Sequence, residues 1–251
     1  MNLLLKPVPV LLALGMVCAT ASAFAQSLSP LVPPDGAAPS TWRFVGFPKS
    51  KADIPATRFE LADVQGERAL KVSTRASYGT WVHDLNHAEP GRLQWRWRLD
   101  QALTGGKGVA DILTKAGDDA ALKVCVMFDH PLDRVPFVER TLLRIARSLS
   151  GEDLPAATLC YVWDSVHPAG LQGPNPYTPR VRFITLQGKG AGLAQWQTET
   201  RDVAADFAKL FAEEWPAGAA VPKVRAVLVG ADSDNTGAES VGWVKALSWL
   251  R

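Results

Sequence analysis

The chain has 251 residues, of which 47% are apolar and 21% are charged, and it carries 18 prolines and 20 glycines. This length and apolar content allow a substantial core, and we expect one domain. The formal net charge is only +2, so no excess of charge points to nucleic acid as a partner.

The first 25 residues have the layout of an export signal. Lys6 precedes an apolar stretch from Val8 to Val17, and the small residues that follow offer Ala21-Ser22-Ala23 or Ala23-Phe24-Ala25 as cleavage sites. A transmembrane anchor is the alternative, but no apolar stretch reaches the roughly 20 residues that span a bilayer. The sequence therefore predicts a signal peptide over residues 1–25, a periplasmic or secreted protein, and no membrane span after signal removal.

Residues 26–40, QSLSPLVPPDGAAPS, are rich in proline and small side chains, which is typical of an extended leader. From residue 41 the pattern changes to short β-type runs separated by turn residues. In chain order these runs are TWRFVGF, TRFELADV, ALKVSTRAS, TWVHDL, LQWRWRL, LKVCVMF, TLCYVW, RVRFITL, AQWQTETR, KVRAVLVG and VGWVKALSW. About eleven short strands predict an all-β fold, a β-sandwich of jelly-roll type, as a single domain over residues 41–251.

Two segments follow a helical period and predict short helical insertions between strands. The first spans residues 138–149, with its apolar face on Val138, Leu142, Ile145, Ala146 and Leu149. The second spans residues 201–214, with its apolar face on Val203, Phe207, Leu210 and Phe211. We expect both faces to cover a sheet end or edge; membrane binding is the less favoured alternative.

Alternation along the strands sorts side chains into a core face and a second face. Leu93, Trp95, Trp97 and Leu99 form one set and are predicted to be core. The same sorting separates Val181 and Phe183 from their neighbouring arginines. If the strands share one sheet, the second face collects Arg96, Arg98, Lys123, Asp164 and Arg182 around Cys125 and Cys160. Such a face is typical of a binding site for a polar or anionic compound, and a solvated face of paired charges is the alternative.

Cys125 and Cys160 are the cysteines that remain after the signal. Their shared face and the predicted export favour a disulfide, and two buried free thiols are the alternative. The four histidines lie singly near predicted strand ends, and neither G-x-S-x-G nor H-E-x-x-H occurs. We therefore expect no cofactor and no metal.

The segment VGADSDNTGAES, from Val229 to Ser240, leaves three interpretations open. Asp232, Asp234, Asn235 and Glu239 have the oxygen ligands of a hard cation, but their spacing does not match a calcium loop. They also suit a polar ligand site. Since Asp, Asn, Ser and Gly shape tight turns, turn chemistry is the preferred interpretation.

Several blocks in order resemble the bacterial DUF3047 family of exported proteins of unknown function: LQWRWRLD, KAGDDAALKVCVMFD, LPAATLCYVWDS, NPYTPRVRFITLQ and GADSDNTGAESVGWV. The resemblance extends from Trp42 to the C-terminus and implies a jelly-roll sandwich, similar in outline to lectin-like and glucanase-like domains, without an established activity. Its polar blocks fall on Asp118, Asp119, Trp163, Tyr177, Arg180, Asp232, Asp234, Asn235 and Thr236. Cys125 departs from the family, where an aromatic residue is expected.

We expect a non-catalytic binding domain for a polar, glycan-like ligand. The alternatives are a carbohydrate-active enzyme that uses Asp118, Asp119, Asp164 or Tyr177, and a structural envelope protein. The candidate ligand-binding residues are Arg96, Arg98, Lys123, Asp164, Tyr177, Arg180, Arg182, Asp232, Asp234 and Asn235.

Overall fold

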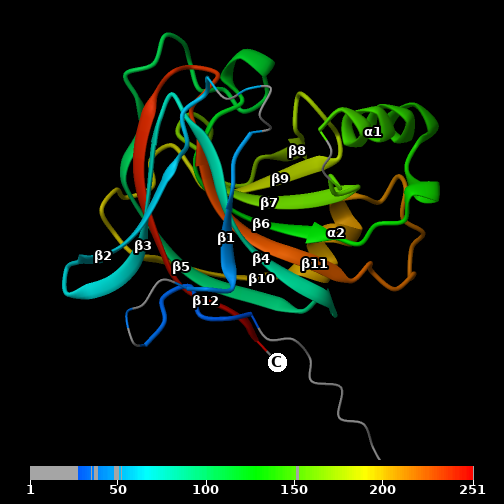
Figure 1. The fold of residues 1–251 in the computed structure, drawn as a ribbon, viewed down its shortest axis with the longest axis horizontal. Coiled ribbons are helices and arrows are strands. Elements are labelled where there is room, and N and C mark those ends of the chain that lie inside the picture. Colours follow the sequence, from blue (N-terminus) through cyan, green and yellow to red (C-terminus); the bar gives the residue numbers. More distant parts are fainter. Residues whose placement is uncertain are drawn as a thin grey trace, which may run out of the picture.

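A computed structural model describes residues 28–34, 36, 39–47, 51, 53–150 and 153–250 as two β-sheets packed face to face (Figure 1). The seven-stranded sheet has the order β1-β4-β11-β6-β7-β9-β8, and the five-stranded sheet has the order β10-β5-β12-β3-β2. The described strands are β1 (Trp42–Val45), β2 (Arg58–Val64), β3 (Glu67–Arg75), β4 (Tyr78–Ala88), β5 (Arg92–Thr104), β6 (Ala120–Phe128), β7 (Ala157–Trp163), β8 (Gln172–Pro174), β9 (Val181–Gln187), β10 (Gln197–Asp202), β11 (Val224–Asp232) and β12 (Glu239–Leu250). The predicted all-β sandwich of jelly-roll type is confirmed.

Neighbouring strands are antiparallel except for β7 and β9, which run parallel. Short 3₁₀ turns span Lys115–Gly117 and Leu132–Arg134. The helices are α1 (Phe137–Ser150), inserted between β6 and β7, and α2 (Val203–Leu210), which directly follows β10. All eleven predicted runs form strands, and β8 is the strand that the sequence pattern missed.

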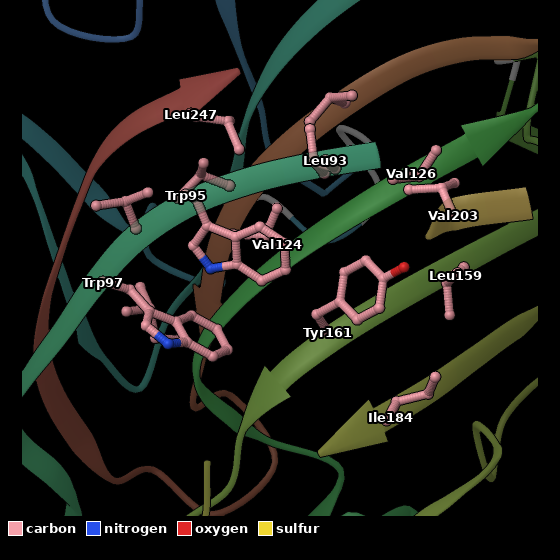
Figure 2. Close-up of a cluster of buried hydrophobic side chains, with 14 of the residues drawn as sticks. Leu93, Trp95, Trp97, Val124, Val126, Leu159, Tyr161, Ile184, Val203 and Leu247 are labelled. Carbon is pink, nitrogen blue, oxygen red and sulfur yellow. The ribbon is translucent and has the colours of Figure 1, made fainter. Parts of the chain in front are cut away.

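The core lies between the two sheets and is built on aromatic side chains of β5 and β7 (Figure 2). Trp95 and Trp97 have no exposed surface, which confirms their predicted core face. Their rings reach across to the other sheet: Trp95 lies 5.2 Å from Tyr161, and Trp97 lies 5.4 Å from Trp163, between ring centroids. These contacts join the two sheets through large apolar surfaces, the dominant stabilising contribution in a domain of this size.

The predicted single polar face is wrong because β5 belongs to one sheet and β6, β7 and β9 to the other. Arg96 and Arg98 therefore lie on a different sheet from Lys123. The faces of β9 are also reversed, because Arg182 pairs in register with the core residue Leu159 while Phe183 pairs with Cys160.

The outer face of the seven-stranded sheet is itself apolar, which explains the reversed assignment. Buried on it are Val82, Cys125, Cys160, Val162, Phe183, Ala226 and Leu228, together with Ile112 from the segment before β6. Strands with two apolar faces lose the alternation on which face assignment depends. The loop that carries Ile112 thus covers part of this face.

Cys125 and Cys160 are directly opposed on β6 and β7, with Cα atoms 4.0 Å apart, and form a disulfide. The two positions are separated by 35 residues, and the closed loop contains α1. The predicted neighbourhood of the two cysteines is confirmed, and the alternative of two free thiols is not what the structure contains.

The two helices differ in how they meet the sandwich. Phe207 of α2 is fully buried and its ring lies 4.6 Å from that of Phe128, so α2 covers the sheet end as predicted. In α1, Leu143 is the buried apolar side chain. The predicted contact face of α1 is wrong, because Val138, Leu142, Ile145 and Leu149 are all exposed.

The packed part of the domain begins before residue 41. Leu28 and Leu31 belong to the core, and the Ser29 amide donates to Nε2 of His83. The predicted signal peptide over residues 1–25 lies outside the described residues. None of the helices in the described part of the chain has the length and hydrophobicity to cross a bilayer.

Candidate functional site

Three loops meet beside the end of β11 and bring together five of the ten predicted ligand-binding residues. The loops are the segment before β6, the segment between β8 and β9, and the turn between β11 and β12. We call their shared polar cluster the loop site; it comprises Tyr78, Asp118, Asp119, Lys123, Asn175, Tyr177, Asp232, Asp234 and Asn235.

A buried ion pair lies at the base of the loop site. Nζ of Lys123 donates to Oδ2 of Asp232 at 2.8 Å, and the Ala120 amide donates to Oδ1 at 2.9 Å. Burial alone lowers the pKa of Lys123, but the Asp232 carboxylate and Tyr78 more than offset it, so the pKa is raised overall. Both groups are thus used within the protein, since a buried charge needs a partner.

A glycine lies beside this pair, at a close approach between strands. Gly230 lies opposite Lys123 in the register of β11 and β6. A Cβ atom at Gly230 would lie 2.9 Å from Cγ2 of Thr80, 3.0 Å from the Gly79 carbonyl oxygen and 3.4 Å from Cε of Lys123. The glycine therefore makes room mainly for Thr80 and the Gly79 backbone of β4, and the lysine stem would be in ordinary contact with such a Cβ atom.

Asp119 shapes the turn between β11 and β12. Its carboxylate accepts from the amides of Asn235 at 3.1 Å and Thr236 at 2.9 Å, and also from the Thr236 hydroxyl. Gly237 completes the turn with a φ of 71°, which favours glycine. The turn interpretation of this segment is therefore correct for its backbone, and Asp119 is the side chain that holds it.

An exposed tyrosine ring forms one wall of the loop site. The Tyr177 side chain is held by its hydroxyl, which lies 2.9 Å from the Lys115 carbonyl oxygen and 3.0 Å from Oδ1 of Asn235. The Asn235 amide nitrogen in turn donates to the Asp118 carbonyl at 2.9 Å. These contacts hold the ring in place. The residue remains 57% exposed, with Nζ of Lys115 lying 5.6 Å from the ring centroid.

Two carboxyl groups remain beside this ring. Burial is the main cause that raises the pKa of Asp118 to about 6, although the Asn175 amide donates to it at 2.6 Å. Burial and the neighbouring Asp232 raise the pKa of Asp234 to about 6. Asp234 forms no ion pair with any residue that the structure describes. Near neutral pH these two carboxyls can accept hydrogen bonds, and in mildly acidic solution they can donate them.

Two of the four residues that the sequence offered as cation ligands, Asp232 and Glu239, are each bound to another side chain. Glu239 pairs with Arg75 at 2.8 Å on the five-stranded sheet, and Asp232 is held by Lys123. In the described ranges, no group of three or more His, Cys, Asp or Glu side chains is arranged to hold a metal ion.

The remaining predicted residues lie away from the loop site. Arg96 is near Glu67 and Arg98 binds Asp100 at 2.5 Å, both on the five-stranded sheet. The Asp164 carboxylate accepts two amides at 2.6 Å and closes a turn after β7. These contacts are structural.

Arg180 and Arg182 lie near the helices. Arg180 binds Glu214 through two hydrogen bonds of 2.9 Å, and the Arg182 guanidinium lies 4.5 Å from the Phe211 ring centroid. Sequence reasoning also missed Tyr78 and Asn175 of the loop site. Asn175 lies in the NPYTP block that carried the family resemblance, and the prolines of this block are a turn signal that could have indicated it. Tyr78 begins a strand, and no sequence pattern indicated that it belongs to the site.

A polar hollow away from the loop site is lined by residues of β8, β9, β10 and α2, among them Glu199, Arg201 and Asp206. Here Asp206 accepts from the Tyr161 hydroxyl at 2.8 Å and from Arg201 at 2.9 Å. Glu199 accepts from the Trp97 indole and the Gln187 amide. Both acids are satisfied internally.

A family model described as "Protein of unknown function (DUF3047)" matches residues 40–248, which is most of the chain. The chain belongs to the DUF3047 family. No curated protein matches this DUF3047 sequence.

Solved structures with a similar outline include proteins that bind or cleave polysaccharides. A family 61 carbohydrate-binding module in complex with β-1,4-galactotriose is 10% identical, with 84% of this chain and 89% of that chain covered and a TM-score of 0.34. The catalytic domain of Humicola grisea Cel12A, soaked with a thio-cellotetraose, is 11% identical over 85% and 95% of the two chains, with a TM-score of 0.42. The xyloglucanase domain of NopAA from Sinorhizobium fredii, in complex with cellobiose, is 9% identical over 77% and 92%, with a TM-score of 0.36. At these values none of them assigns an activity to this DUF3047 protein.

Proposed function

We propose that this protein is a non-catalytic binding protein whose loop site recognises a neutral, hydroxyl-rich glycan. One observation carries the proposal: the exposed Tyr177 ring is fixed beside two carboxyls, Asp118 and Asp234, that form no ion pair within the described residues, although Asp118 accepts the Asn175 amide. A sugar ring presents an apolar face and a rim of hydroxyls. An aromatic ring beside hydrogen-bond acceptors is complementary to both.

The charge of the loop site selects among polar ligands. It holds four carboxyl groups, on Asp118, Asp119, Asp232 and Asp234, against the Lys115 and Lys123 ammonium groups. An anionic compound would meet like charge there, which is unfavourable. We therefore narrow the polar or anionic ligand predicted from the sequence to a neutral glycan.

A carbohydrate-active enzyme is the second candidate, and the raised pKa values favour it. General acid and base groups work best when their pKa lies near the working pH. Asp118 and Asp234, each with a pKa raised to about 6, meet that condition in mildly acidic solution. Binding remains the first choice because Asp119 and Asp232, the other carboxyls of the cluster, are bound internally.

A glycan array probed with the full-length protein tests the proposal. The array includes β-1,4-galactan and β-1,4-glucan oligosaccharides. We expect retention of at least one neutral glycan, a lower signal for Tyr177→Ala, and no release of reducing sugar over a day at pH 5 to 7. Release that Asp118→Asn abolishes would establish the enzyme instead, and an array without a Tyr177-dependent signal would contradict glycan binding.

We also propose that the protein acts in the periplasm or outside the cell, on the basis of the signal-like layout of residues 1–25. N-terminal sequencing of the protein recovered from cell fractions tests this. A start near Gln26 in the exported fraction is expected. Recovery of the uncleaved chain from the cytoplasm would contradict it.

A further inference from the structure

Helix α1 exposes a continuous apolar stripe. Val138 is 67% exposed, Leu142 61%, Ile145 51% and Leu149 83%, and Phe137 at the start of the helix is 73% exposed. At 3.6 residues per turn the first four lie within an arc of roughly 60°. Half of the exposed large hydrophobic residues in the described part of the chain thus lie on this helix, and Figure 1 shows it at the periphery of the molecule.

The stripe is held outward by contacts on another side of the helix. Leu143 packs with Val135 and Ala156 in a small buried cluster. Glu139 binds Arg180 at 2.6 Å, and Arg147 binds Asp153 at 3.0 Å. With these anchors the helix cannot turn its apolar stripe inward without breaking buried and paired contacts.

The charged side chains of α1 that form no ion pair with any residue the structure describes are positive. Its charged residues are Glu139, Arg140, Arg144 and Arg147, and the first and last are paired as described. Arg140 and Arg144 form no ion pair within the described residues. A helix is about 10 Å across, so both guanidinium groups would stay within about one Debye length of an anionic surface that the stripe contacts.

We propose that α1 docks this protein on an anionic lipid surface, with the apolar stripe at the headgroup and acyl boundary. An amphipathic helix with an apolar face, an arginine-bearing polar face and little overall hydrophobicity is the kind that lies in a membrane interface. A second copy of the chain fits less well. A stable protein interface uses about 20 to 30 residues a side, and α1 exposes five large apolar side chains.

Vesicle flotation with the full-length protein tests the proposal, using phosphatidylcholine vesicles with and without about one third phosphatidylglycerol. We expect binding to the anionic vesicles that falls at least tenfold at high salt. Leu142→Asp combined with Ile145→Asp should abolish it, and Arg144→Gln should weaken it about fivefold. Leu193→Asp, at an exposed leucine of another loop, is the matched control and should bind like the parent.

All variants share the N-terminal segment, so a loss confined to the α1 variants assigns binding to the helix. Unchanged melting curves verify that the variants fold, since the altered side chains are exposed. Equal flotation of parent and double variant, equal binding to neutral vesicles, or no flotation of the parent would each overturn the proposal. So would a dimer in light scattering that the double variant makes monomeric without any vesicle binding.

Discussion

At the scale of single residues, the loop site is defined by which carboxyls the fold already uses. Asp119 and Asp232 accept backbone amides and, in one case, a buried ammonium group. Asp118 and Asp234 are partly buried with fewer such contacts, so their pKa values rise to about 6. Having few internal contacts leaves them available to a ligand, and their burial makes the charged form unfavourable in the folded state.

Asp234→Asn should therefore stabilise the protein at neutral pH. The carboxyl titrates near 3.8 when unperturbed and near 6 when folded, so between these values the folded state binds more protons. Stability falls as pH rises through this window and stays lower above it. With allowance for screening at a partly buried group, the variant should gain about 1 kcal/mol at pH 7 and lose much of this pH dependence.

Thermal melts from pH 4 to 8 measure both effects. Asp63→Asn, at an exposed strand end, is the control and should change stability by less than about 0.5 kcal/mol. A lower stability of Asp234→Asn at pH 7, with the parent's pH profile retained, would contradict the assigned burial of this carboxyl.

Calcium should leave the melting temperature unchanged to within about 1 °C, because Asp232 is occupied by Lys123 and Glu239 by Arg75. A cation bound at 100 times its dissociation constant would instead add about 2.7 kcal/mol. Scanning calorimetry with millimolar calcium distinguishes the two. A rise of several degrees in the melting temperature that disappears in Asp234→Ala would show instead that the turn binds a cation.

At the scale of elements, strands with one apolar face were predictable and strands with two were not. The alternation in β5 placed Trp95 and Trp97 correctly in the core. In β9 the outer residue Phe183 is as apolar as the inner residue Ile184. The alternation of side chains along this strand therefore predicted the wrong face as the core face. The α1 pattern predicted a helix correctly but could not tell an apolar stripe that packs from one that stays exposed.

Trp97→Ala should lower the free energy of unfolding by about 3 to 5 kcal/mol, because a fully buried indole is lost from the contact between sheets. Chemical denaturation measures the loss. Leu193→Ala, at a residue that is 46% exposed, serves as control and should change little. Similar denaturation midpoints for both variants would contradict the core assignment.

At the scale of the whole molecule, long-range contacts decide the site. Three distant parts of the chain meet in one cluster: Lys123, Tyr177 and the segment with Asp232, Asp234 and Asn235. The arginines that were predicted as ligand-binding residues with them lie elsewhere. Arg96 and Arg98 are on the five-stranded sheet, and Arg180 and Arg182 lie near the helices. Local pattern identifies residue types and strands, whereas sheet order, which the sequence pattern does not contain, decides which of them meet.

The disulfide is a second contact at this scale. Replacing both Cys125 and Cys160 by alanine opens the loop that carries α1, and on the chain-entropy model such a loop of 35 residues contributes up to about 4 kcal/mol. We expect a loss of about 2 to 4 kcal/mol in denaturation of the double variant. Free thiols in the parent, detected by alkylation of the unfolded protein and mass spectrometry, would contradict the bond.

We propose that the loop site binds a neutral glycan through Tyr177. Isothermal titration calorimetry with the tightest glycan from the array measures the contribution of this residue. We predict a 10- to 30-fold weaker affinity for Tyr177→Ala, as for a central aromatic contact, and about fivefold for Tyr177→Phe, which keeps the ring and loses its hydroxyl contacts. Phe137→Ala on α1 should bind like the parent. Equal affinities for the parent and Tyr177→Ala would contradict the account.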